Sequence, residues 1–128
     1  MTLPATARLF IALGALAALL AVALGAFGAH GLKSRLGADM MAICQTGVQY
    51  HFWHALGLVL VGLIAIQLPG SGALRAAGWL MAAGILMFSG SLYALALSGV
   101  RWLGAITPFG GLAFLAAWAC LAWAALRG

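Results

Sequence analysis

Three histidines, two cysteines and one carboxylate are the side chains of this 128-residue sequence that could bind a metal or move a proton. His51 and His54 are three residues apart, so on a helix both imidazoles would share a face. Ser89 and Tyr93, four residues apart, would share a face of another helix. Imidazole, thiolate and carboxylate groups can ligate zinc or copper, but no spacing here matches a known metal motif. We therefore predict no metal site and no cofactor.

These residues do not form a recognisable catalytic pattern either. Asp39 is the only carboxylate in the chain, which excludes chemistry by paired carboxylates. No serine or cysteine is spaced with a histidine and an acid as in a known nucleophile motif, and no phosphate-binding loop is present. The sequence therefore predicts that the protein is not an enzyme.

The elements that must position these side chains are strongly apolar. Hydrophobic residues make up 66% of the chain and charged residues 5%, whereas a soluble domain has about 25% charged residues. Four runs without Arg, Lys, Asp or Glu have the length that a helix needs to cross a bilayer core. They cover residues 9–29, 48–68, 76–97 and 108–126. The sequence predicts an all-α integral membrane protein, a four-transmembrane-helix bundle that forms a single domain over residues 1–128.

The longest stretch between two predicted spans, residues 30–47, has mixed polarity. Met40, Met41 and Cys44 supply apolar surface, and Gln45 and Thr46 supply polar surface. This pattern is typical of an amphipathic helix on the membrane surface, which is one interpretation. The other is a long extension of the second span.

The charges are scattered singly between the runs. Six Lys or Arg residues against one acid give a net charge of +5. A basic protein often binds nucleic acid, but isolated charges beside membrane spans favour anchoring to anionic lipid headgroups. We therefore expect membrane lipids as partners and no nucleic acid. Four spans also place both termini on one side of the membrane, and the free N-terminal amine favours the cytoplasm.

Polar side chains gather toward the other side of the predicted bundle, where residues 30–47 and 98–107 connect the spans. Polar groups at membrane depth are costly unless they are paired, so we expect partners for each. Two interpretations stay open: the groups fix the packing of the helices, or they form a ligand site. The candidate cluster is His30, Asp39, Gln49, His51, His54, Ser89, Tyr93, Arg101 and Thr107.

Small residues indicate where helices approach closely. Ala17, Ala21 and Gly25 recur every four residues along one face of the first span. Gly110 and Gly111 are adjacent in the last span, where glycine lowers helix stability, so a close helix contact is the favoured reason for them. The pair Thr107-Pro108 predicts the start of that helix, with Thr107 as its N-cap.

Four motifs in fixed order resemble domain-of-unknown-function family 423. They are Gly25–Leu32 (GAFGAHGL), the stretch with Tyr50-His51 and His54-Ala55-Leu56, Phe88–Tyr93 (FSGSLY) and Ile106–Gly111 (ITPFGG). This family comprises small bacterial inner-membrane proteins, with relatives among mitochondrial membrane proteins of eukaryotes. The resemblance covers nearly the full chain and implies a four-helix protein of the bacterial inner membrane. It implies no activity and no catalytic residue.

Three classes of function follow from these observations. The favoured class is a structural or accessory membrane component that acts through lipid contacts, other membrane proteins or self-association. The alternatives are a small oligomeric transporter or channel, and a metal- or quinone-binding redox protein. Transporters usually have an ionisable or broken-helix site near the bilayer midplane. The midpoints of the predicted spans lie near Leu19, Leu58, Leu86 and Ala117, which are apolar, and this favours the accessory class.

Overall fold

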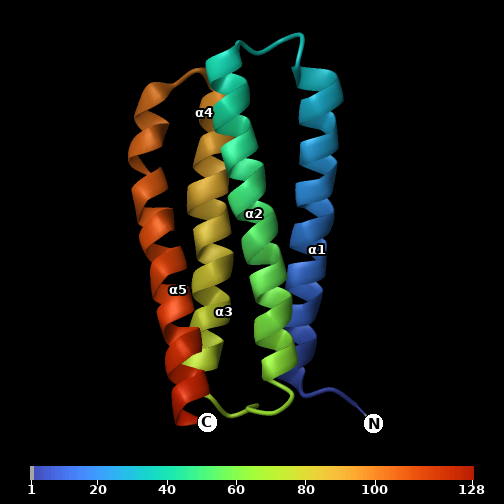
Figure 1. Cartoon of the computed structure of the whole chain (residues 1–128), viewed down its shortest axis with the longest axis vertical. Helices are drawn as coiled ribbons and strands as arrows, with labels where there is room; N and C mark the ends of the chain where they lie inside the picture. The colour runs from blue at the N-terminus through green and yellow to red at the C-terminus, as the bar shows by residue number, and fades with distance from the viewer. Residues whose placement is uncertain (1) are drawn as a thin grey trace.

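The computed structural model describes residues 2–128, and regular structure within them is entirely helical. Figure 1 shows four long rods side by side. The first rod is α1 (Ala5–Phe27) with a π-helical end, η1 (Gly28–Leu32), and the second is α2 (Ala38–Ile64). The third rod joins α3 (Gly72–Gly84), the π-helical η2 (Ile85–Ser89) and α4 (Gly90–Ser98). The fourth is the 3-10 helix η3 (Arg101–Ala105) followed by α5 (Thr107–Arg127).

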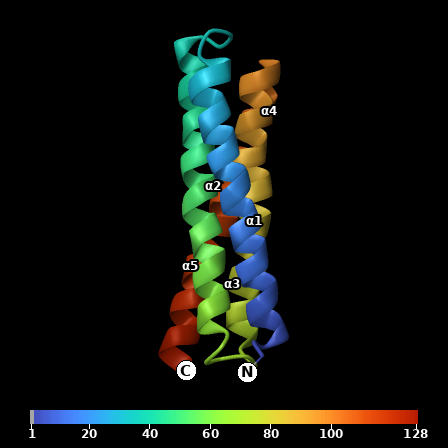
Figure 2. The same ribbon diagram turned by 90° about the vertical axis from the view of Figure 1, so that its right-hand side faces the viewer.

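The rods have the dimensions of membrane spans. They measure 28, 27, 27 and 27 residues and carry few charges. At 1.5 Å per residue each is about 40 Å long, which matches a bilayer with its headgroups. Figure 2, turned by 90° from Figure 1, shows the rods running along one common axis, with both ends of the chain at the same end of the bundle. The prediction of an all-helical bundle with four spans is confirmed.

The second rod corrects one expectation. No separate surface helix lies between the first two spans, because residues 38–47 form the first turns of α2. The break comes at Gly37, whose extended backbone (φ −67°, ψ 167°) precedes the helix. From Ala38 to Ile64 the helix is continuous. Of the two interpretations, the long extension of the second span is right, and it moves the midpoint of this span from Leu58 to His51.

Glycines allow α1 and α2 to approach closely. A Cβ atom on Gly14 would lie 2.7 Å from the carbonyl oxygen of Ala55, and one on Gly62 would lie 2.8 Å from the backbone nitrogen of Ile11. Each helix thus meets the backbone of the other where it has no side chain of its own. Close backbone contact through small residues is a principal source of helix association in membranes.

The third and fourth rods pack in the same way around the π-helical segment. A Cβ atom on Gly84 would collide with the ring of Phe114, and one on Gly110 would lie 2.7 Å from Cα of Phe88. Within η2 the Gly90 N–H donates to the carbonyl of Ile85, five residues back instead of four. The midpoint of the third span, near Leu86, is apolar as the sequence indicates, and the helix is π-helical there.

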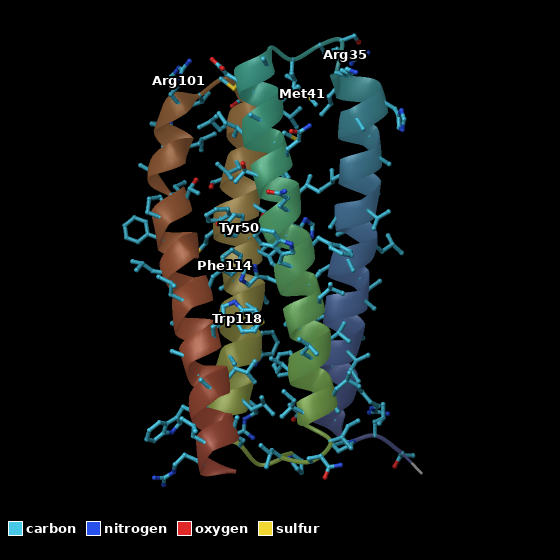
Figure 3. All side chains as sticks on the ribbon, in the orientation of Figure 1. Arg35, Met41, Tyr50, Arg101, Phe114 and Trp118 are labelled. Atoms are coloured by element: carbon cyan, nitrogen blue, oxygen red, sulfur yellow. The ribbon has the colours of Figure 1, made fainter. Side chains whose placement is uncertain are left out.

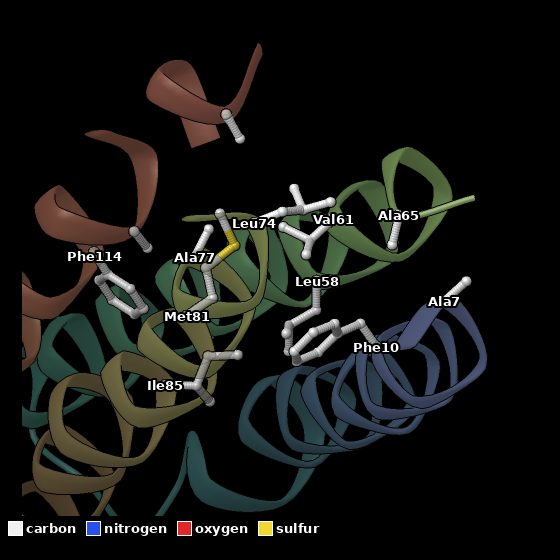
Figure 4. Close-up of a cluster of buried hydrophobic side chains, with 12 residues drawn as sticks. Ala7, Phe10, Leu58, Val61, Ala65, Leu74, Ala77, Met81, Ile85 and Phe114 are labelled. Carbon is white, nitrogen blue, oxygen red and sulfur yellow. The ribbon is translucent and has the colours of Figure 1, made fainter. Parts of the chain in front are cut away.

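The main hydrophobic core fills the half of the bundle nearer the termini. Phe10, Leu58, Leu74 and Met81 are the largest of its fully buried apolar side chains, and each is at most 1% exposed. Figure 4 shows them between the rods, with Phe114 at one edge of the cluster. A smaller cluster of Leu32, Cys44 and Ala96 lies at the opposite end. The polar side chains described below lie between these two clusters.

Candidate functional site

Two hydrogen bonds join α2 to the third rod near the middle of the bundle. His51 Nδ1 lies 2.8 Å from Tyr93 Oη, and Ser89 Oγ donates to the carbonyl oxygen of Gly47 at 2.7 Å. His51 is 5% exposed and Ser89 is fully buried. A Cβ atom on Gly47 would lie 2.9 Å from Cε1 of Tyr93, so glycine is the residue that lets the tyrosine ring lie against α2.

His54, one turn further along α2, has a hydrogen-bond partner at each ring nitrogen. Its Nδ1 lies 2.8 Å from the carbonyl oxygen of Tyr50, and its Nε2 lies 2.9 Å from the indole nitrogen of Trp118. An indole N–H can only donate, so Nε2 accepts and Nδ1 carries the hydrogen that is donated to Tyr50. The geometry therefore holds His54 as a neutral imidazole in one tautomer.

Aromatic rings surround His54. Its ring stacks on Phe114 with 3.5 Å between centroids and an interplanar angle of 11°. Tyr50 packs on Phe88 at 4.5 Å, and both line a groove of about 590 Å³ beside α5. Figure 3 shows Tyr50, Phe114 and Trp118 between α2 and α5, at mid-height of the bundle. This aromatic cluster joins α2 to α5, which approach each other mainly through side chains.

Thr107 pairs with a residue outside the candidate list. Its hydroxyl lies 2.6 Å from Ser91 Oγ, which itself donates to the carbonyl oxygen of Phe88 at 2.9 Å. Thr107 therefore donates to Ser91, since a serine hydroxyl has one hydrogen. The expectation that Thr107 caps α5 is wrong: Thr107 is the first residue of the helix and makes no capping bond. Its hydroxyl connects α5 to the third rod instead.

Four candidates do not join these pairs. His30, Asp39, Gln49 and Arg101 are exposed, and the single polar cluster that we expected does not form. Figure 3 shows Arg101 at the end of the bundle opposite the termini, well above Tyr50. Gln49 lies near His51 in sequence, but two residues are about 200° around a helix, so the two side chains point to opposite faces of α2.

The small residues that we expected at helix contacts lie in the interfaces of the bundle. Ala21 is 1% exposed, Ala17 is half-buried against the core, and a Cβ atom on Gly25 would lie 3.3 Å from Val48. Gly110 meets the backbone of Phe88, whereas a Cβ atom on Gly111 would lie 3.9 Å from the ring of Phe88. The two adjacent glycines therefore differ, and only Gly110 is required by a close contact.

Sequence reasoning missed Trp118 and Ser91. Trp118 carries the one signal that could have identified it, because it lies deep inside a predicted span. An indole N–H inside a membrane span needs an acceptor, and few acceptors exist at that depth. Ser91 had no such signal, since serine is common in membrane helices and its partner depends on how the rods align.

The polar side chains of this site can hold the helices together, because their hydrogen bonds are made within the bundle. Among residues 2–128, no buried side-chain nitrogen or oxygen lacks a hydrogen-bond partner. Within the same residues, no three His, Cys, Asp or Glu side chains come close enough to hold a metal ion. Cys44 and Cys120 are both free thiols. His51 and Tyr93 also line a hollow of about 430 Å³ between α1, α2 and the third rod.

Comparison with known proteins identifies the family to which this chain is similar. The model of a family described as protein of unknown function (DUF423) matches residues 24–111. The UPF0382 membrane protein YwdK of Bacillus subtilis is 52% identical over 120 residues, which cover 94% of this chain and 98% of that protein. The UPF0382 membrane protein SERP0230 of Staphylococcus epidermidis is 48% identical over 122 residues, covering 94% and 97%. The UPF0382 membrane protein SH2409 of Staphylococcus haemolyticus is 47% identical over 116 residues, covering 89% and 92%. No solved structure matches the chain.

Proposed function

Because the chain belongs to the DUF423 family of membrane proteins, we propose that it is an accessory component of the bacterial inner membrane. In this proposal it acts through contacts with lipids and with other membrane proteins or further copies of itself. It has no catalytic centre and does not bind nucleic acid. Its four spans make it a multi-pass protein, so almost all of its surface is available for contacts inside the bilayer.

The observation that carries the proposal is the closed pairing of the polar side chains. His51 bonds to Tyr93, His54 to Trp118 and Ser91 to Thr107, and His54 and Ser91 each also bond to a backbone carbonyl. Pairing of this kind fixes the alignment of rods. It leaves an apolar outer surface as the part of the molecule that can meet a partner.

That outer surface is extensive on the first and last rods. Leu16 and Leu19 of α1 are 60% and 61% exposed, and Leu115 of α5 is 69% exposed. In water such patches would be unusual, but in a bilayer they face acyl chains or neighbouring helices. A protein that acts by contact would use these two outer faces.

Site-specific photo-crosslinking in the native membrane tests the proposal. A photoreactive amino acid at Leu19 or Leu115 should give discrete products with lipid or with membrane proteins. The matched control is the same amino acid at Leu58, which is 1% exposed and should react within the chain. Turnover of a solute or a substrate by the purified protein alone would overturn the accessory function.

One observation favours a transporter or channel as the second candidate. His51 is at the midpoint of α2, and the third span is π-helical at its own midpoint, from Ile85 to Ser89. Irregular helices and ionisable groups at mid-membrane are features of transport sites. Purified protein in vesicles should move ions or protons if this candidate is right, and substitution of His51 by Ala should abolish that flux.

A further inference from the structure

A continuous groove runs along the seam between α1 and α2, beginning at the end of the bundle opposite the termini. It consists of three hollows of about 550, 300 and 450 Å³. The first and second hollows share Ala29, Met41 and Gln45, and the second and third share Gly25, Val48 and Gln49. We call the three hollows together the seam groove. It opens on the opposite side of α2 from His51.

Small side chains create the seam groove. Gly25, Ala26 and Ala29 form its α1 wall at helical spacing, and Ala38 and Ala42 form the start of its α2 wall. At Gly28, within the same wall, an added Cβ atom would find no atom within 4 Å. The small residues between Gly25 and Gly31 therefore leave a hollow on the outer surface of α1, in addition to any role in helix packing.

The polarity of the groove changes along its length. Lys33 lines the hollow at the membrane surface, and Phe52 and Trp53 line the hollow at the far end. Gln45 and Gln49 lie between them. From the start of α2 these two amides are about 10 and 16 Å deep at 1.5 Å per residue. Gln45 is therefore near the first acyl carbons, and Gln49 is two residues from the midpoint of α2.

The two amides have no partner in the protein. Both are exposed, and the side-chain hydrogen bonds of residues 2–128 include neither Gln45 nor Gln49. An amide at this depth is costly without a hydrogen-bond acceptor or donor nearby. A ligand with oxygen atoms near the first acyl carbons would satisfy Gln45.

We propose that the seam groove binds one anionic phospholipid. The phosphate lies at Lys33, the ester oxygens accept from the amide of Gln45, and one acyl chain follows the apolar hollow past Gln49 to Trp53. The length agrees: from Ala38 to Trp53 is about 22 Å along α2, close to half the thickness of a bilayer with its headgroups. This inference rests on the proposed function and names one lipid that the protein contacts.

Native mass spectrometry of the purified protein in mild detergent, titrated with phosphatidylglycerol, tests the proposal. Phosphatidylcholine serves as the zwitterionic comparison. Wild-type protein should retain one phosphatidylglycerol per chain and should prefer it to phosphatidylcholine. Lys33→Gln should weaken this binding about fivefold, the effect expected for one cation near a lipid phosphate. Arg101→Gln is the matched control, because Arg101 is an exposed cation at the same end of the bundle and outside the groove.

A second variant tests the shape of the groove. Ala29→Leu places a larger side chain in the two hollows that share Ala29 and should abolish retention of the lipid. Ala94→Leu is its control, since Ala94 is exposed on α4 toward the same end of the bundle. Equal thermal stability of the four variants would show that all of them fold.

Three results would overturn the lipid site. The first is equal loss of binding in Lys33→Gln and Arg101→Gln. It would mean that positive charge at this end of the bundle attracts the lipid and that the groove does not hold it. The second is full retention in Ala29→Leu. The third is a dimer of lipid-free wild-type chains that Ala29→Leu dissociates, which would assign the groove to a second copy. Each would leave the accessory function standing, because crosslinking from Leu115 on α5 reports on a different face.

Discussion

At the scale of single residues, His54 illustrates how this protein handles a polar group inside a membrane. Stacking on Phe114 covers one face of the ring, and Tyr50 and Trp118 occupy its two nitrogens. A charged imidazole would have to give up the bond from Trp118, because a protonated Nε2 cannot accept. The surrounding residues thus favour a neutral ring and hold it in place.

Removal of the donor to His54 should destabilise the bundle. In Trp118→Phe the aromatic packing is largely kept, but Nε2 of His54 loses its partner. We expect a loss of about 1 kcal/mol, as for a typical hydrogen bond between membrane helices, measured as a lower melting temperature in detergent. Trp123→Phe is the control, because Trp123 is exposed near the C-terminus. Equal melting temperatures of the two variants would contradict the role assigned to Trp118.

The bond between His51 and Tyr93 allows a similar comparison between two tyrosines. Tyr93→Phe removes the hydroxyl that lies 2.8 Å from His51 Nδ1, and it should cost about 1 kcal/mol of stability. Tyr50→Phe should cost less, because His54 uses the backbone carbonyl of Tyr50 and not its hydroxyl. Chemical denaturation in mixed micelles measures both. The assignment fails if Tyr50→Phe is the more damaging change.

These residues also show what can be read from a sequence of this kind. The positions of His51, His54, Ser89 and Tyr93 on their own helices followed from a spacing of three or four residues. Their partners did not, because a partner depends on how far one helix is shifted along its neighbour. Hydrophobicity determines that a rod lies in the membrane, but it changes little when one helix shifts along its neighbour. The pairing of Trp118 with His54 therefore could not be predicted from the sequence.

At the scale of elements, the third rod is shaped by its contact with α5. The π-helical η2 lies where Gly110 of α5 reaches the backbone of Phe88. The Ser89 hydroxyl, at the end of η2, donates to the carbonyl of Gly47 in α2. An irregular turn thus lies between two neighbouring rods and contacts both. Four apolar runs predicted the rods, but a π-helical turn has no pattern in composition that would reveal it.

The adjacent glycines of α5 provide a test at this scale. Gly110→Ala would drive a methyl group into the backbone of Phe88, which cannot move aside as a flexible side chain could. We expect a loss of about 1 to 3 kcal/mol, as for other overpacked contacts, or a failure to accumulate in the membrane. Gly111→Ala should be neutral or slightly stabilising, since its methyl group would be in ordinary contact. Equivalent behaviour of the two variants, by expression level and melting temperature, would contradict the close contact at Gly110.

At the scale of the whole molecule, the two ends of the bundle differ in character. The end with the termini contains the main hydrophobic core and the turn that leads to α3, where Ser71 accepts from the Leu74 N–H. The opposite end contains the smaller core cluster, the 3-10 helix and the mouth of the seam groove. Positive charges occur at both ends, so charge alone orients the protein only weakly.

The four-rod architecture requires both termini on one side of the membrane. Figure 1 shows the N- and C-termini at the same end of the bundle. Reporter fusions at the two ends of the chain should therefore give the same readout, and we expect that readout to be cytoplasmic. Opposite readouts would be incompatible with four spans. A fusion inserted at Gly37, in the turn at the other end, should report the opposite side and serves as the internal control.

The glycine contacts of the bundle have a consequence for how the protein is made. Gly14 and Gly62 bring α1 against α2, and Gly84 and Gly110 bring the third rod against α5. Each of these contacts joins rods that leave the ribosome one after the other. The chain can therefore enter the membrane as two helical hairpins, each able to close before the other is complete. Two separately translated halves, divided in the turn around Gly70, should then reassemble in the bilayer into the intact protein.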